Sequence, residues 1–166
     1  MRILTALVIA LTAAGLGLGY PGQNAAPRPE IFMLGDCRIT VLEATFWRDW
    51  MPIVAHPGPD RGSPLRAVIK LRLDNGTGSE AKLSWTGTVI GEDGKSSPLE
   101  LRALPERGTN WDRTMKKGES REITLNAQDG PYLPVGSFAR AEMTWTDQNN
   151  KTVVVRTPKA LVGRTD

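Results

Sequence analysis

Apolar and polar residues alternate along most of the chain beyond residue 27, with a period of two rather than the longer period of an amphipathic helix. In the segment 67–73, Ile69, Leu71 and Leu73 fall on one face of an extended chain, whereas Lys70 and Arg72 fall on the other. This alternation is typical of a β-strand that buries one side. Further runs of this kind, some of them short, occupy residues 38–47, 82–90, 99–101, 122–125, 138–146 and 151–156.

Clusters of turn-forming residues separate these runs. Asp74-Asn75-Gly76 and Glu92-Asp93-Gly94 are two examples, and Gly or Asn in such clusters readily adopts the positive φ of a tight turn. The helices that would connect the strands of a parallel sheet are missing from the pattern. The sequence therefore predicts an all-β fold, an immunoglobulin-like antiparallel β-sandwich of about seven strands.

The N-terminal residues form a different kind of segment. Arg2 precedes an uncharged apolar run over residues 3–19, and Tyr20-Pro21-Gly22 ends that run. This order is typical of a signal peptide, so we assign residues 1–26 to a signal peptide and short linker, with cleavage after residue 19 or after residue 25 or 26. We expect a secreted or periplasmic protein. The alternative is a retained N-terminal anchor, since about 17–25 apolar residues can span a bilayer.

The rest of the chain has the size of a single domain. Roughly 140 residues follow the signal peptide, which is enough for one self-supporting core. We expect an N-terminal lead-in over 27–37, the β-sandwich over 38–162 and a C-terminal tail over 163–166. Within the sandwich, the loop 50–64 is rich in proline, which excludes a central strand or a helix there. It is either a preformed binding surface or a tolerated insertion, and both interpretations stay open.

Several segments together resemble a known group of proteins. Leu34-Gly35-Asp36 leads into Ile39-Thr40-Val41, residues 68–73 are closed by Asp74-Asn75, and Lys117-Gly118-Glu119-Ser120 precedes another strand. Over residues 34–162 this order resembles secreted bacterial immunoglobulin-like modules of unassigned function. More distantly, it resembles the intracellular proteinase inhibitors of bacilli, which are similar sandwiches. The resemblance implies the fold and an exported location, and it assigns no functional residues.

Charge and reactive side chains exclude several function classes. The net charge is +3 and basic and acidic residues are interleaved, which does not favour nucleic-acid binding. His56 is the only histidine and Cys37 the only cysteine, so we expect neither a catalytic triad nor a structural zinc site. Met33, Cys37, Met51 and His56 are the ligand types that copper prefers, but their spacing favours ordinary packing. We therefore expect a non-enzymatic protein without a cofactor or a metal.

Aromatic side chains supply the candidate binding residues. Trp47 and Trp50 lie at the start of the proline-rich loop beside Met51, His56 follows within the loop, and Trp111 lies in a polar stretch. Such side chains stack on sugar rings or anchor protein partners. The alternative is that they pack in the core or cover the end of the sandwich.

These observations lead to a functional hypothesis. We expect a binding or accessory module of the cell envelope whose partner is a protein or an envelope polysaccharide, and which contacts a membrane only if the N-terminal segment is retained. One alternative is a protease-inhibitor-like protein that presents the loop 50–64. Another is a carbohydrate- or peptidoglycan-binding module that uses exposed tryptophans, namely Trp47, Trp50 and Trp111.

We predict that the protein recovered from the envelope fraction of its host lacks about 19 to 26 N-terminal residues, because a signal peptidase removes the exported segment. Intact-mass spectrometry measures this loss directly. A full-length species that is extracted only with the membrane would establish an anchor instead.

Overall fold

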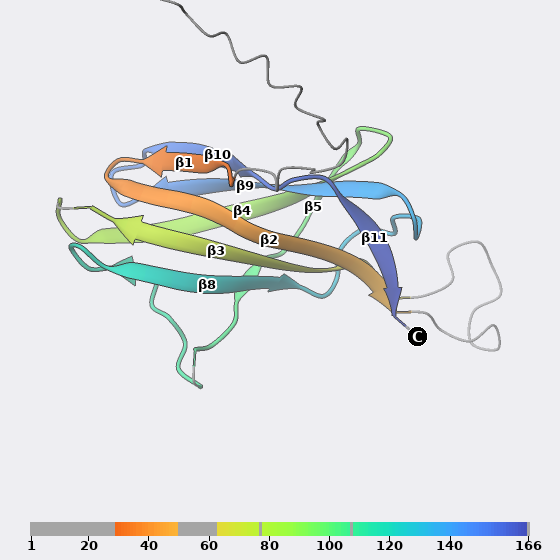
Figure 1. The fold of residues 1–166 in the computed structure, drawn as a ribbon, viewed down its shortest axis with the longest axis horizontal. Helices are drawn as coiled ribbons and strands as arrows, with labels where there is room; N and C mark the ends of the chain where they lie inside the picture. The colour runs from red at the N-terminus through yellow and green to blue at the C-terminus, as the bar shows by residue number, and fades with distance from the viewer. Residues whose placement is uncertain (1–28, 50–62, 77, 107, 166) are drawn as a thin grey trace, which may run out of the picture.

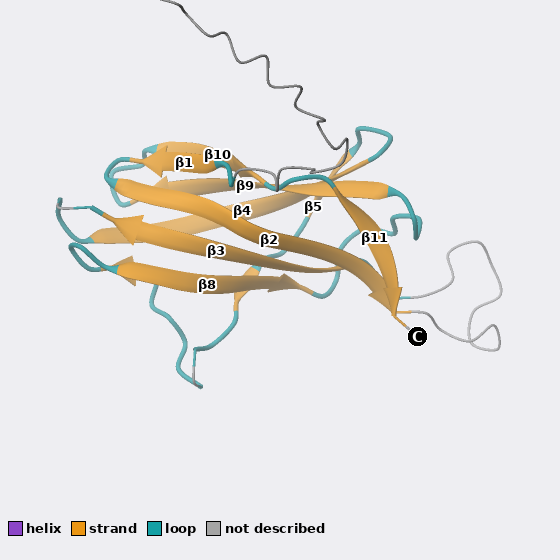
Figure 2. Cartoon of the chain, viewed as in Figure 1, coloured by secondary structure: helices purple, strands orange, loops and turns teal. Residues whose placement is uncertain are grey.

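The computed structural model describes residues 29–49, 63–76, 78–106 and 108–165. Within these residues the chain forms strands, turns and loops, and it forms no helix (Figure 2). The fold is therefore all-β, as the alternation predicts. In the same residues no helix is long and apolar enough to cross a membrane.

The described residues form eleven strands, more than the roughly seven of the predicted sandwich. Six of them coincide with predicted runs: β2 (Cys37–Asp49), β3 (Arg66–Asn75), β4 (Ala81–Gly91), β8 (Ser120–Ala127), β9 (Phe138–Asp147) and β10 (Thr152–Arg156). The additional strands are mostly short: β1 (Ile31–Leu34), β5 (Ser96–Pro98), β6 (Arg102–Ala103), β7 (Thr114–Met115) and β11 (Ala160–Thr165).

Hydrogen bonds join the strands into one curled sheet, in the order β5-β4-β9-β11-β2-β3-β8-β6, with β1 on β2, β10 on β9 and β7 on β4. The half containing β4 and β9 and the half containing β2, β3 and β8 enclose a common core (Figure 1). β11 joins the halves, because Ala160 and Leu161 pair antiparallel with β9 and the next residues pair parallel with β2. This parallel pairing departs from the purely antiparallel arrangement that the sequence predicts.

Burial of the side chains follows the predicted alternation. On β3, Ile69, Leu71 and Leu73 are fully buried, and on β9 the same holds for Met143 and Trp145. The residues between them on each strand face outward and are exposed or partly exposed. The strand phase predicted from the sequence is therefore confirmed for these two strands.

The segment 99–101 is not the strand that the sequence predicts. It connects β5 to β6, which are the two ends of the sheet, and it buries Leu99 and Leu101 between the halves. Gly87 on β4 makes room for this crossing, because a Cβ atom there would lie 2.6 Å from Leu101 Cδ1 and 2.7 Å from the Leu99 carbonyl oxygen. The apolar pattern of the segment thus reflects core packing rather than strand pairing.

Three tryptophans pack in a row where the chain passes from β6 to β7. The ring centroids of Trp145 and Trp85 are 5.0 Å apart, and those of Trp85 and Trp111 are 6.2 Å apart with an interplanar angle of 14°. Trp85 Nε1 donates a hydrogen bond to the Leu101 carbonyl at 3.0 Å. The guanidinium of Arg113 lies 4.5 Å from the Trp85 ring centroid. The row of tryptophans therefore extends the hydrophobic core as far as the connection between β6 and β7.

Two predicted boundaries differ from the structure. The lead-in 27–37 contains β1, which turns into β2 at Gly35, a glycine with a φ of +59°. Residues 163–165, assigned above to a C-terminal tail, belong to β11. Neither strand shows a clear alternation, because each has a single buried residue, Leu34 or Val162. The signal peptide and almost all of the loop 50–64 lie outside the described residues and stay predictions.

We expect Trp145→Ala to lower the free energy of unfolding by about 3–5 kcal/mol, as the loss of a large core side chain does. Trp145→Phe should cost only about 1–2 kcal/mol, because Trp145 Nε1 has no hydrogen-bond partner among the described residues and burying an unpaired donor is itself unfavourable. Urea unfolding followed by circular dichroism measures both values.

The matched control is Trp85→Phe. Unlike Trp145→Phe, it also removes a hydrogen bond, the one that Trp85 Nε1 donates to the Leu101 carbonyl. Equal losses for Trp145→Phe and Trp145→Ala would contradict the assignment of an unpaired indole N–H in the core.

Candidate functional site

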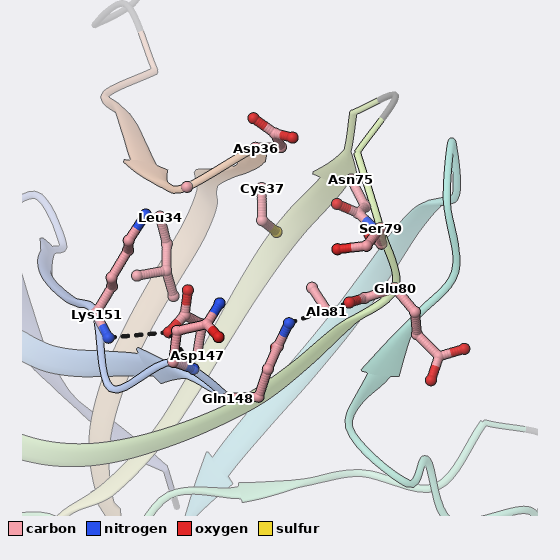
Figure 3. Close-up of a pocket in the computed structure, with 12 residues that line it drawn as sticks. Leu34, Asp36, Cys37, Asn75, Ser79, Glu80, Ala81, Asp147, Gln148 and Lys151 are labelled. Carbon is pink, nitrogen blue, oxygen red and sulfur yellow. Dashed lines mark hydrogen bonds between the residues drawn. The ribbon is translucent and has the colours of Figure 1, made fainter.

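The turns at one end of the sheet surround a pocket of about 160 Å³ (Figure 3). The β1–β2 turn contributes Asp36, the β3–β4 connection contributes Ser79 and Glu80, and the β9–β10 turn contributes Gln148 and Lys151. The pocket is a polar hollow built by segments that are far apart in the sequence.

Hydrogen bonds within the turns occupy the central polar side chains of this pocket. Asp147 Oδ1 accepts two backbone N–H groups of its own turn, at 2.8 and 2.9 Å. Gln148 accepts the N–H of Lys82 at 2.8 Å and donates to the Glu80 carbonyl at 3.1 Å. Asn75 is buried and donates to backbone carbonyls of two neighbouring segments. These side chains fix the turns that surround the pocket.

Cys37 lines the same pocket and is only 1 % exposed. Burial, reinforced by the negative charge of Asp74, raises the pKa of its thiol to about 11, so the thiol is protonated at neutral pH and is a poor nucleophile. Met33, another member of the copper-type set considered above, points outward from β1 and is exposed. Among the described residues no group of three or more His, Cys, Asp or Glu side chains is placed to hold a metal ion.

The opposite end of the sheet carries an exposed apolar surface. Phe138 on β9 pairs directly with Leu161 on β11, and Gly163 on β11 pairs with Trp47 on β2. Directly paired residues, and residues two apart on one strand, point to the same face of a sheet. Phe138 is 44 % and Leu161 is 55 % exposed, and Trp47 is half-buried. These three side chains, called the outer strip below, lie on the outer face of three adjacent strands.

Tyr132, in the connection between β8 and β9, presents a third aromatic ring at this end. The Arg48 guanidinium packs against the ring, with its Cζ 5.0 Å from the ring centroid. Arg48 is buried and donates hydrogen bonds to the carbonyls of Ser63 at 2.8 Å and Leu133 at 3.1 Å. The Tyr132 ring is 54 % exposed, although this support restricts its orientation. With Glu92 and other residues it lines a pocket of about 440 Å³.

The structure describes two of the five predicted binding residues, Trp47 and Trp111. Trp47 belongs to the outer strip. Trp50, Met51 and His56 lie outside the described residues, and their binding role stays a prediction.

Trp111 is not part of this surface. It is half-buried in the connection between β6 and β7, where it stacks on Trp85 and donates a hydrogen bond to the Thr114 carbonyl at 2.9 Å. The Arg121 guanidinium also lies 5.7 Å from the centroid of its ring. The geometry corresponds to the packing alternative considered for this residue, and it does not bring Trp111 and Trp47 together.

Three residues of the exposed end are missing from the sequence-based candidates, namely Tyr132, Phe138 and Leu161. Phe138 had a usable signal, because it shares the outward phase of Arg140 and Glu142 in the run 138–146. Leu161 had none, because its neighbours follow no clear alternation. Its position beside Phe138 depends on a pairing between β9 and β11 that only the structure reveals.

The sequence matches no protein-family model and no curated protein. Several solved structures match most of the chain. A DUF4426 family protein from Pseudomonas aeruginosa is 12% identical, with a TM-score of 0.45 over 83% of this chain and 97% of its own. The apo PCuAC domain from PmoF1 is 14% identical, with a TM-score of 0.43 over 82% and 100%. A FixG-related protein from Vibrio parahaemolyticus is 14% identical, with a TM-score of 0.37 over 78% and 98%. Similarity at this level assigns neither a family nor a function.

Proposed function

We propose that this chain is a non-enzymatic binding module of the cell envelope that contacts a protein partner through the outer strip and Tyr132. In this proposal the N-terminal segment directs export, and the curled sheet is an immunoglobulin-like sandwich that holds the binding surface at one end. The observation that carries the proposal is the exposure of Phe138 and Leu161 side by side on paired strands.

The chemistry of this surface suits a protein partner. Exposed apolar side chains that are adjacent, rather than scattered singly, are typical of interaction sites. Tyr and Trp at such sites combine a large contact area with a polar group, and they are enriched among residues that dominate binding energy. Tyr132 is held by Arg48 before any partner arrives, which lowers the entropy lost on binding.

The protease-inhibitor alternative has one specific observation in its favour. The two ends of the predicted loop are held together, because Ser63, near the end of the loop, bonds Asp49, which precedes it. Ser63 N–H donates to the Asp49 carbonyl at 2.9 Å, and Ser63 Oγ accepts the Asp49 N–H at 2.8 Å. Both residues lie at the same end of the sheet as Trp47. A loop fixed at both ends beside an apolar surface is a suitable arrangement for presenting a segment to a protease.

The carbohydrate-binding alternative has less support at Trp111. Trp85 and Arg121 both contact the ring of Trp111, which reduces the ring surface available for stacking on a sugar. Trp47 remains available to this alternative, and Trp50, outside the described residues, stays a candidate in it.

To test the proposal, a photo-crosslinking amino acid replaces Phe138 or Leu161 in the full chain, expressed in the cells that naturally produce it. We expect crosslinked protein adducts at both positions, because their side chains are exposed and adjacent. Denaturing gel electrophoresis followed by mass spectrometry detects and identifies the adducts.

The matched control is the same substitution at Val154, an exposed apolar residue on β10 away from this surface. Adducts of similar yield at Val154, or none at Phe138 and Leu161, would exclude the outer strip as the binding surface.

A further inference from the structure

β8 has one edge that is only partly paired. Along one side it pairs with β3 from Ser120 to Ala127. On the other side β6 pairs only with Leu125 and Asn126, and the Leu104 N–H then donates to the Thr124 carbonyl at 2.8 Å. Pro105 follows, and because proline has no N–H group the ladder ends there.

The backbone groups of β8 beyond this point face the open edge. In an antiparallel sheet, successive residues direct their N–H and C=O groups to opposite edges. Since the Thr124 carbonyl points toward β6, the backbone groups of Glu122 and Ser120 point to the same edge. No backbone of the described residues pairs with them there. The outermost strand at the other end of the sheet order, β5, instead carries Pro98, a common protection of strand edges.

A groove of about 350 Å³ runs beside this open edge. Ile123 is nearly buried in it, and Leu104, Pro105 and Trp111 contribute apolar walls from the connection between β6 and β7. Figure 1 shows this connection projecting beyond β8. The Leu104 side chain, in the wall of this groove, is 44 % exposed.

Hydrogen bonds and ion pairs hold the groove open. The Arg121 guanidinium bonds Glu106 and Glu119, each at 2.9 Å, and it also lies over the Trp111 ring. Two hydrogen bonds between the backbones of Glu106 and Thr109, at 2.9 and 3.0 Å, close the tip of the projecting connection. The groove is therefore formed before any ligand arrives, which reduces the cost of binding.

We infer that this edge binds an extended polypeptide segment of another protein, which adds a strand to β8 and places an apolar side chain in the groove. Alternating N–H and C=O groups at a strand edge are complementary to another extended backbone. The charged residues that line the groove are the carboxylates of Glu106 and Glu122 and the guanidinium of Arg121. With their ion-pair partners they make three carboxylates (Glu106, Glu119 and Glu122) against two guanidinium groups (Arg72 and Arg121), so one negative charge is in excess. A basic residue next to the apolar one therefore improves the fit. This site is separate from the outer strip and does not depend on the function proposed above.

The test uses a phage-displayed library of random peptides of about ten residues, panned on the immobilised full chain. We expect enriched peptides that combine an apolar residue with a basic one, and whose synthetic forms bind at least about tenfold more weakly to Glu122→Pro. This variant removes the outward N–H of Glu122 and spares the ladder to β3, because proline is tolerated on a strand edge. Glu122→Ala keeps the backbone N–H and should bind like the wild type.

A second variant, Leu104→Arg, fills the groove from an exposed position and should also abolish binding, so the inference stays testable if Glu122→Pro does not fold by circular dichroism. The inference is overturned if no peptides are enriched, or if enriched peptides bind Leu104→Arg as they bind the wild type. Loss of binding in Phe138→Ser rather than in the groove variants would also overturn it, and would support the outer strip as the binding surface.

Discussion

The pairing of β11 with two different strands is the interaction on which the rest of this structure depends. Its first residues continue the β9 side of the sheet and its last residues run parallel to β2, so a single strand joins the halves that enclose the core. Val162, at the point of transfer, is buried, and its backbone also exchanges hydrogen bonds with Gly136 and Ser137. The same pairing positions Leu161 beside Phe138 and brings Gly163 opposite Trp47. The outer strip is thus a consequence of how the sheet closes.

On the far side of the curled sheet, only short backbone contacts reach β4, namely the strand β7 and the Leu99 N–H, and side-chain packing supplies the rest of the closure. Leu99 and Leu101 cross from β5 to β6, and Trp85 and Trp111 stack beside them. This side-chain packing buries apolar surface on the far side of the sheet without using the outward backbone groups of β8. The first half of the β8 edge is left open for this reason, and the groove next to it is lined by the same connection that carries Trp111.

The sequence predicted the parts of this fold that depend on local alternation. Ile69, Leu71 and Leu73 on β3 and Trp145 on β9 point inward as their spacing requires. β11 was missed because a strand with one buried residue has no period to recognise, and 99–101 was misassigned because an apolar segment that crosses the core looks like a short strand. The candidate surface combines residues from β2, β9 and β11, and its assembly follows from long-range pairing that no single segment encodes. Phe138 was the exception, since a large aromatic residue in the polar phase of a strand indicates an exposed ring.

Amide hydrogen exchange of the full chain, resolved to individual residues, tests the central role of β11 most directly. If β11 joins the two halves, two neighbouring amides of β11 exchange as slowly as those in the middle of β3 and β9, because they open only when the sheet opens. These are the amide of Val162, which donates to the Ser137 carbonyl, and the amide of Gly163, which points to the opposite edge and therefore to β2. Exchange of these amides at the rate of the exposed turn at Gly94 would contradict the account, since β11 would then be a mobile tail and the outer strip would lose its central strand.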